Sequence, residues 1–242
     1  MIGAPHVHHR VTDSTNRRAR ALAEDGAPHG TLVTADEQTA GRGRQGRSWS
    51  APAGSAVLMS VVVRDLAPGA EALLPLTAAV AACEGVDAAA AVRCEIKWPN
   101  DVWLEGRKLA GILVEGRPAE GWAVVGIGIN VSARLADLPD ELRSTATSLA
   151  SAGRSGARSD EVLSAVVLAL DRRLGTPAPE LLDAWRGRDA LHGERVTWSG
   201  GTGVAAGVDE SGALIVETGA GERVRLDAGE VHLTGAAGRS TT

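Results

Sequence analysis

The order of the secondary-structure signals is the feature that most constrains how this chain can fold. Residues 7–189 mix strand and helix signals, whereas the remainder of the chain contains strand signals alone. A change of this kind is typical of a change of architecture, so it predicts a domain boundary near Leu191. We therefore expect a main domain over residues 1–190 and a small second domain over residues 191–242.

Hydrophobic patterning predicts the individual elements. Runs rich in β-branched and apolar residues predict strands at 31–36, 57–63, 93–98, 109–115 and 122–131. Helices are predicted at 16–24, 70–83 and 160–174, the last with Ser159 as its N-cap. After His192, short strands at 195–198, 214–217, 223–226 and 231–233 alternate with turn residues, a pattern that predicts a small β-barrel.

Composition limits both the core and the partners of this protein. The chain has six Trp but no Phe and no Tyr, so its core must be built mainly from Ala, Val, Leu and Ile. The 25 Lys and Arg residues against 30 Asp and Glu give a formal net charge of −5. This balance argues against a general affinity for nucleic acid or for an anionic membrane.

The cysteines and the N-terminus favour a cytoplasmic protein. Cys83 and Cys94 have neither a metal-ligand spacing nor a CxxC spacing, so we expect two reduced, buried thiols rather than a disulfide or a zinc site. The first residues lack the charged and apolar regions of a signal peptide. No apolar run is expected to be long enough to cross a bilayer.

The strongest local motif is Gly41-Arg42-Gly43-Arg44-Gln45-Gly46-Arg47, which we call the Arg-Gly loop (residues 41–47). It matches the spacing GxGxxG, but no helix is predicted directly after it, so a dinucleotide-binding turn is excluded. Glycine amides can approach a ligand closely, and guanidinium groups bind carboxylate or phosphate oxygens in bidentate fashion. The loop therefore indicates an anion site that is mobile when empty, with a solvated basic turn as the alternative.

A second basic cluster is expected around a hairpin. Lys97-Trp98-Pro99-Asn100-Asp101 should end one strand and open a hairpin with its turn at Glu105-Gly106, and the return strand begins near Lys108. An ammonium group at the start of an apolar strand needs an anionic partner or a route to water. Taken alone, a lysine beside a turn that reaches solvent is the simpler interpretation.

Two further segments have patterns that are compatible with a role in ligand binding. In residues 125–131, strand alternation places Gly126, Gly128 and Asn130 on one face and larger apolar residues on the other. Glycines weaken a strand, so their presence favours close approach either by a ligand or by a packed helix, and the sequence does not decide between these. Asp13 or Ser14 is predicted to cap the helix that follows.

Taken together, these motifs closely resemble the biotin protein ligase family. The matching segments are Asp13-Ser14-Thr15-Asn16, Gln38-Thr39-Ala40-Gly41-Arg42-Gly43-Arg44, Lys97-Trp98-Pro99-Asn100-Asp101, Lys108-Leu109-Ala110-Gly111-Ile112-Leu113 and Gly126-Ile127-Gly128-Ile129-Asn130. The resemblance implies an α+β fold in which a mixed β-sheet has helices packed on one side, as in class II aminoacyl-tRNA synthetases. It also implies a C-terminal SH3-like β-barrel, with Gly207-Val208-Asp209 and Gly229-Glu230-Val231 as its markers.

The resemblance assigns roles to individual residues. Those implied for biotin are Ser14, Thr15, Asn16, Gln38, Arg42, Gly43, Arg44, Lys108 and Gly111. Those implied for ATP are Arg44, Arg47, Trp49, Lys97, Asn100 and Asn130. Lys108 and Arg44 would be catalytic, since a carboxylate and a phosphate repel one another, and Asp101 would orient or accept a proton from the acceptor lysine.

The implied reaction uses ATP, with Mg²⁺ bound to its phosphates, to convert biotin into biotinyl-5′-AMP. The biotinyl group then passes to a lysine of a biotin carboxyl carrier domain, while the Arg-Gly loop closes over the intermediate to exclude water. We expect no DNA partner, because the Ser14-Thr15 pair comes too early for a preceding DNA-binding domain. Two features depart from the family pattern. Gln45 affects how tightly the Arg-Gly loop is expected to bind the adenylate, and segment 132–149, which has no aromatic residue, affects how adenine is expected to be bound.

Two other functions are compatible with these residues. A lipoyl or other acyl-protein ligase would share the fold and the adenylation chemistry. A non-catalytic biotin sensor would use the same pocket without turnover, and its cationic residues would then be dispensable.

Overall fold

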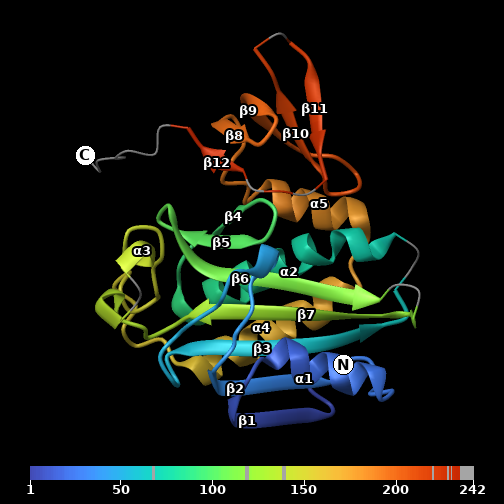
Figure 1. The fold of residues 1–242 in the computed structure, drawn as a ribbon, viewed down its shortest axis with the longest axis vertical. Coiled ribbons are helices and arrows are strands. Elements are labelled where there is room, and N and C mark those ends of the chain that lie inside the picture. The colour runs from blue at the N-terminus through green and yellow to red at the C-terminus, as the bar shows by residue number, and fades with distance from the viewer. Residues whose placement is uncertain are drawn as a thin grey trace.

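The protein contains a seven-stranded mixed sheet and a smaller antiparallel sheet (Figure 1). The structure is a computed structural model and describes residues 1–66, 69–117, 120–137, 140–219, 221–227, 229 and 231–234. The strands of the main sheet are β1 (His6–Thr12), β2 (Leu32–Gln38), β3 (Ala56–Arg64), β4 (Glu95–Lys97), β5 (Asp101–Leu104), β6 (Arg107–Arg117) and β7 (Trp122–Asn130). Their order in the sheet is β1-β2-β3-β7-β6-β5-β4.

Both strand directions occur in the main sheet. Strand β1 pairs in parallel with β2, whereas the other neighbours are antiparallel. The predicted hairpin joins β5 to β6, and its turn residues Glu105 and Gly106 both have positive φ, as a tight two-residue turn requires. The three N-terminal histidines lie in β1, the edge strand beside β2.

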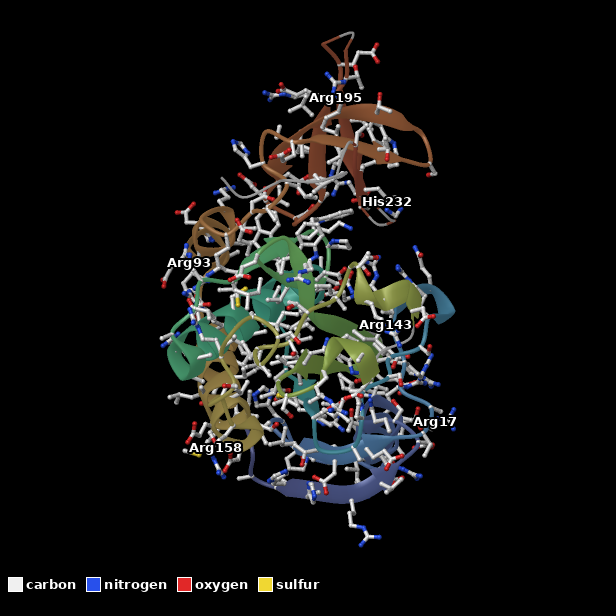
Figure 2. The ribbon with its side chains drawn as sticks, turned by 90° about the vertical axis from the view of Figure 1, so that its left-hand side faces the viewer. Arg17, Arg93, Arg143, Arg158, Arg195 and His232 are labelled. Carbon is white, nitrogen blue, oxygen red and sulfur yellow. The ribbon has the colours of Figure 1, made fainter. Side chains whose placement is uncertain are left out.

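Five α-helices accompany the sheet in the described part of the chain: α1 (Thr15–Glu24), α2 (Ala70–Ala90), α3 (Asp140–Arg143), α4 (Ser159–Leu174) and α5 (Ala178–Arg186). Helices α2 and α4 cover one face, where they form the main core with residues such as Val61 and Val125. Helix α1 packs on the opposite face against a smaller cluster that includes Val33, Val62 and Val124. Figure 2 shows the sheet edge-on, with Arg17 and Arg143 on one side and Arg158 on the other.

The smaller sheet follows α5. Its strands are β8 (Arg195–Trp198), β9 (Gly201–Val208), β10 (Leu214–Glu217), β11 (Arg223–Leu226) and β12 (His232–Leu233), in the order β11-β10-β9-β8-β12. Its buried residues Val196, Leu214 and Val216 belong to the same apolar cluster as the main core. The indole Nε1 of Trp98 also donates to the carbonyl oxygen of Gly212 at 3.0 Å, so a residue beside the main sheet contacts a turn of the small one.

The predicted α+β fold with a mixed sheet is confirmed, although helix α1 lies on the opposite sheet face from α2 and α4, so the helices are not all on one side. Several elements also need correction. Helix α2 continues past residue 83 to Ala90, and strand β9 and helix α5 were not among the predicted elements. Helix α4 begins at Ser159 itself, so that residue is not the cap, and Ser14 precedes α1 without a capping side-chain bond. Glu230, one of the residues in the C-terminal markers, lies outside the described residues.

The expectation about apolar runs was wrong for α2. By length and composition this 21-residue helix, with a mean hydropathy of 1.4, could cross a membrane. However, 61% of its most apolar window is buried inside the protein, where α2 packs against α4 and the sheet. This burial is typical of the core helix of a globular protein, so the composition of α2 is weak evidence for a membrane span.

Candidate functional site

A cavity of about 380 Å³ lies on the sheet face that α1 only partly covers. Every residue that the resemblance assigned to the site lines this cavity: Ser14, Thr15, Asn16, Gln38, Arg42, Gly43, Arg44, Arg47, Trp49, Lys97, Asn100, Asp101, Lys108, Gly111 and Asn130. They come from the start of α1, the end of β2, the Arg-Gly loop, the β4–β5 hairpin and strands β6 and β7. The volume is in the range of cavities that bind small molecules.

Glycines on two neighbouring strands form the floor of the cavity. In the β6–β7 ladder Gly111 is opposite Gly128, and Leu113 is opposite Gly126. A Cβ atom on Gly126 would lie 1.9 Å from Asn16 Oδ1, and one on Gly128 would lie 2.6 Å from the Trp49 ring. The bare strand face is therefore needed to admit one side chain from α1 and another from the segment after the Arg-Gly loop.

Buried polar side chains form a hydrogen-bonded network at one end of the cavity. Gln38 Oε1 accepts from the amide of Thr15 at 2.7 Å and from its hydroxyl at 3.0 Å. The Ser60 hydroxyl donates to Asn16 Oδ1 at 2.6 Å and lies 2.8 Å from Thr15 Oγ1. Asn16 Nδ2 donates to the Leu113 carbonyl at 3.2 Å. These contacts fix the amides, so that Gln38 turns Oε1 toward the start of α1 and leaves Nε2 as its donor.

Cationic side chains from two separate segments, the Arg-Gly loop and strand β6, meet at the cavity. Lys108 Nζ lies 2.6 Å from Asp101 Oδ1, and Arg44 Nη1 donates to Asn100 Oδ1 at 3.1 Å. Arg42 Nη1 lies 2.9 Å from the carboxylate of Glu115. The three cations therefore line one cavity, and they do not point separately into bulk solvent.

The Arg-Gly loop folds back on itself. Its residues Arg44–Gly46 form a 3₁₀ turn, and Arg42 pairs with Ser48 as an isolated bridge. Gln45 has a φ of 55°, a left-handed conformation that an L residue seldom adopts. No α-helix follows before β3 begins at Ala56, which agrees with the exclusion of a dinucleotide-binding turn.

Two buried polar atoms in the cavity lining have no hydrogen-bond partner within the protein. They are Trp49 Nε1, a donor, and Asn130 Oδ1, an acceptor, whereas Asn130 Nδ2 donates to the Thr147 carbonyl at 3.0 Å. A buried polar atom without a partner is costly, by about 1–3 kcal/mol. A ligand that accepts from the indole and donates to the amide would remove this cost.

Sequence reasoning missed several residues of the site. Ser60 is a single hydroxyl in the apolar strand β3, and Glu115 is the acid near the end of β6. The aromatic-free segment also contributes Leu142, Thr145 and Ala146 to the cavity, so its side chains there are aliphatic or small. The single polar residue inside an otherwise apolar strand was the signal that could have identified Ser60.

Comparisons with known proteins give the class of the protein. The family model described as the biotin/lipoate A/B protein ligase family matches residues 8–132, and the model of the biotin protein ligase C terminal domain matches residues 192–233. The biotin–[acetyl-CoA-carboxylase] ligase of Paracoccus denitrificans is 40% identical, over 93% of this chain and 98% of its own. The corresponding ligase of Mycobacterium tuberculosis is 37% identical, over 92% of this chain and 86% of its own.

Solved structures agree with the sequence comparisons. The biotin protein ligase from Aquifex aeolicus in complex with biotin and ATP has a TM-score of 0.79 and 29% identity, and covers 95% of this chain and 98% of its own. The chain therefore belongs to the biotin protein ligase family, whose members are ATP-dependent ligases.

Proposed function

We propose that the cavity is the place where biotin and ATP form biotinyl-5′-AMP, before the biotinyl group passes to a lysine of a biotin carboxyl carrier domain. The observation that carries this proposal is the convergence of Arg42, Arg44 and Lys108 on one glycine-floored cavity. The two reactants are anions, and several cations are needed to hold a carboxylate against a phosphate. The acetyl-CoA-carboxylase ligases among the relatives support the carrier domain of a biotin-dependent carboxylase as the acceptor.

The polar end of the cavity favours biotin over lipoate. A ureido ring presents one carbonyl acceptor and two N–H donors, whereas the dithiolane ring of lipoate presents no strong donor or acceptor. Gln38 Nε2 and the Ser14 hydroxyl supply donors, while Asn16 Oδ1 and Thr15 Oγ1 supply acceptors. A dithiolane would offer no hydrogen-bond partner to these groups, so their remaining donor and acceptor capacity would stay unused.

In the first step, a carboxylate oxygen of biotin attacks the α-phosphorus of ATP and pyrophosphate leaves. We assign Lys108 and Arg44 to the stabilisation of the negative charge that grows on the phosphoryl oxygens. Arg42 and the backbone of Gly43 would hold the carboxylate, and Gly111 leaves room for the ligand chain. Closure of the Arg-Gly loop would keep water away from the mixed anhydride.

In the second step, the amine of the acceptor lysine attacks the acyl carbon and AMP leaves. The ammonium group of that lysine must first lose a proton, and Asp101 is the one carboxylate among the described lining residues. Its Oδ1 lies 2.6 Å from Lys108 Nζ, so the proton acceptor and the charge-stabilising cation are neighbours. We therefore assign Asp101 to orientation or deprotonation of the acceptor lysine.

The opposite end of the cavity is assigned to ATP. Arg47, Lys97 and Asn100 would bind phosphate and ribose oxygens, while the unpartnered Trp49 Nε1 and Asn130 Oδ1 are available to ATP. Mg²⁺ fits this site as an ion bound to the phosphates, where it would neutralise charge. No group of three or more His, Cys, Asp or Glu side chains in the described residues could hold a metal ion, so ATP itself would supply most of its ligands.

The division of the chain also belongs to the proposal. We assign residues 1–190 to the catalytic domain and residues 191–242 to an SH3-like C-terminal domain. The free thiols of Cys83 and Cys94 support a cytoplasmic location, and the net charge of −5 gives no support to DNA as a partner.

Separate reactions of the full chain with ATP, Mg²⁺ and either biotin, lipoate or octanoate test this function. We expect pyrophosphate release with biotin, and a carrier domain that gains one biotinyl group on its acceptor lysine. Labelling of the carrier with lipoate or octanoate but not with biotin would overturn the assignment.

A further inference from the structure

One carboxylate just outside the cavity lining contacts two of the elements that build the site. Glu115 projects from β6 on the strand face that carries Gly111 and Leu113, and its side chain is 17% exposed. Its Oε1 lies 2.9 Å from Arg42 Nη1 and 3.5 Å from Arg20 Nη1, and its Oε2 accepts from Asn16 Nδ2 at 3.0 Å. The Arg-Gly loop and the start of α1 therefore meet at a single acidic group.

We propose that Glu115 is a positioning residue, which anchors the Arg-Gly loop through Arg42 and orients Asn16 toward biotin. This inference rests on the proposed function, because both partners of Glu115 line the cavity assigned to biotin. Glu115 is not assigned a contact with the ligand. Its effect on catalysis is exerted through the two side chains that it holds.

The orientation of Asn16 depends on the charge of Glu115. Both N–H groups of Asn16 Nδ2 are engaged, one by the Glu115 carboxylate and the other by the Leu113 carbonyl. If the amide turned over, Asn16 Oδ1 would face an acceptor-only carboxylate, and two negative oxygens would be in contact. Glu115 therefore keeps Oδ1 as the acceptor that is offered to the N–H of a ureido ring. A glutamine at this position could donate to Oδ1 and would remove that constraint.

The position of the loop depends on the same carboxylate. Side-chain contacts from Arg44 to Asn100 and from Arg42 to Glu115 are among those that tie the Arg-Gly loop to the hairpin and strands. Glycine-rich segments have a large conformational entropy, so side-chain contacts of this kind select one loop position from many. A single exposed ion pair would contribute little, but Glu115 is mostly buried and binds two guanidinium groups.

The test uses the full chain and a matched pair of substitutions, Glu115→Gln and Glu84→Gln. Glu84 lies on α2, on the other sheet face, where it is 18% exposed and also pairs with two arginines, Arg172 and Arg173. We expect Glu115→Gln to raise the KM for biotin about tenfold, the scale of losing one hydrogen bond to a charged group, with kcat for pyrophosphate release within about threefold of the wild type. Glu84→Gln should change neither constant.

The contact of Glu115 with the Arg-Gly loop is tested by a separate measurement, the escape of the intermediate. Glu115→Gln should increase the rate at which free biotinyl-AMP appears in solution by about tenfold. In a double-mutant cycle, the effects of Arg42→Gln and Glu115→Gln on this escape should be less than additive, because both substitutions remove the same Arg42–Glu115 contact. Glu115→Asp, which restores the charge, should retain more of the intermediate than Glu115→Gln.

The inference is overturned if Glu115→Gln lowers the melting temperature as Glu84→Gln does but leaves the KM for biotin and the adenylate escape at wild-type values. In that case Glu115 serves the fold alone. Failure of the proposed function gives a different result, in which the wild-type chain releases no pyrophosphate with biotin.

Discussion

The two faces of strand β7 have different functions, although they are formed by alternating residues of one segment. On the side of α2 and α4, Val125, Ile127 and Ile129 are almost completely buried and fill the main core. On the other side, Gly126, Gly128 and Asn130 line the cavity. One face contributes to stability by the volume that it fills, and the other permits binding by the volume that it leaves open.

This contrast shows how a strand can bear two glycines without loss of the fold. A glycine in a strand costs conformational entropy and buries no side chain. In β7 that cost is offset by pairing with β3 on one edge and β6 on the other along the whole strand, and by a fully packed opposite face. The core face therefore supports the open face, and the two should respond differently to substitution.

The largest effect is expected for Lys108→Ala, which should lower kcat for pyrophosphate release by about 10²- to 10³-fold, the usual loss for one group that stabilises transition-state charge. The lysine is partly exposed and pairs with Asp101 at the edge of the open face, so the melting temperature should change little. Stopped-flow or coupled pyrophosphate assays would measure the rate. Arg107→Ala, at the neighbouring position outside the cavity lining, is the control, and wild-type turnover by Lys108→Ala would contradict the catalytic role assigned to Lys108.

A substitution on the core face should act on stability alone. Ile129 is fully buried, and Ile129→Ala should lower the free energy of unfolding by about 3 kcal/mol through lost burial and a cavity. The KM for biotin at a temperature where the variant is folded should remain within about twofold of the wild type. Urea denaturation and a biotin titration would show both quantities, and a large rise in KM would contradict the division between the faces.

A substitution at Gly128, the adjacent residue on the open face, should change substrate binding and not stability. In Gly128→Ala the new Cβ would lie 2.6 Å from the Trp49 ring, so the indole must move within the cavity. We expect the KM for ATP or biotin to rise about tenfold, since a group that shapes the site is displaced, while the unfolding free energy changes by less than about 1 kcal/mol. Steady-state kinetics with each substrate varied in turn would test this, and unaltered KM values for both would remove Gly128 from the ligand site.

The smaller sheet extends the comparison, because its strongest polar cluster serves the fold. Burial raises the pKa of Asp209, but hydrogen bonds from Ser211, Ala213 and Arg225 outweigh burial and hold the pKa at about 2. Because the pKa of Asp209 is lower in the folded state, its carboxylate stabilises the folded protein at pH values above the ordinary pKa of about 3.8. This contribution is lost as the pH falls toward 2. Asp209→Asn should therefore cost about 1 kcal/mol at pH 7, because the carboxylate is 28% exposed and solvent screens its pairs.

The pH dependence gives this prediction its control. The difference in unfolding free energy between wild type and Asp209→Asn should shrink as the pH is lowered from 5 to 2.5. A difference that stays constant across this range would show that the carboxylate charge is not the source of the stability.

Much of the architecture could be predicted because its signals are local. Strands β8, β10 and β11 have the expected bounds, since each is an apolar or alternating run between turn residues. Strand β9 was missed because GTGVAAGV has few β-branched residues, and its pairing with β8 and β10 replaces what intrinsic propensity lacks. The predicted end of helix α2 at residue 83 was too early, because Gly85 disfavours a helix by sequence. In the structure Gly85 lies inside the helix, and it is needed there because a Cβ would lie 2.6 Å from Val166 of α4.

The site residues likewise include some that the sequence could identify and some that it could not. Residues in recognisable motifs lie together in the cavity as the resemblance implied, although their roles stay predictions. The sequence could mark Ser60 as an unusual polar residue but could not place it, and it could not mark Glu115, because their importance comes from contacts with Asn16 across 44 and 99 positions of sequence. Only the strand pairing and the packing of α1 bring those residues together.

The most direct test of the account is a crystal structure of the full chain with biotin and a non-hydrolysable ATP analogue. The account predicts biotin on the open face of β6 and β7, with its ureido ring beside Asn16 and Gln38 and its carboxylate between Lys108 and the Arg-Gly loop. Ordered biotin at another place, with the glycine floor of the cavity still covered by Trp49, would contradict it.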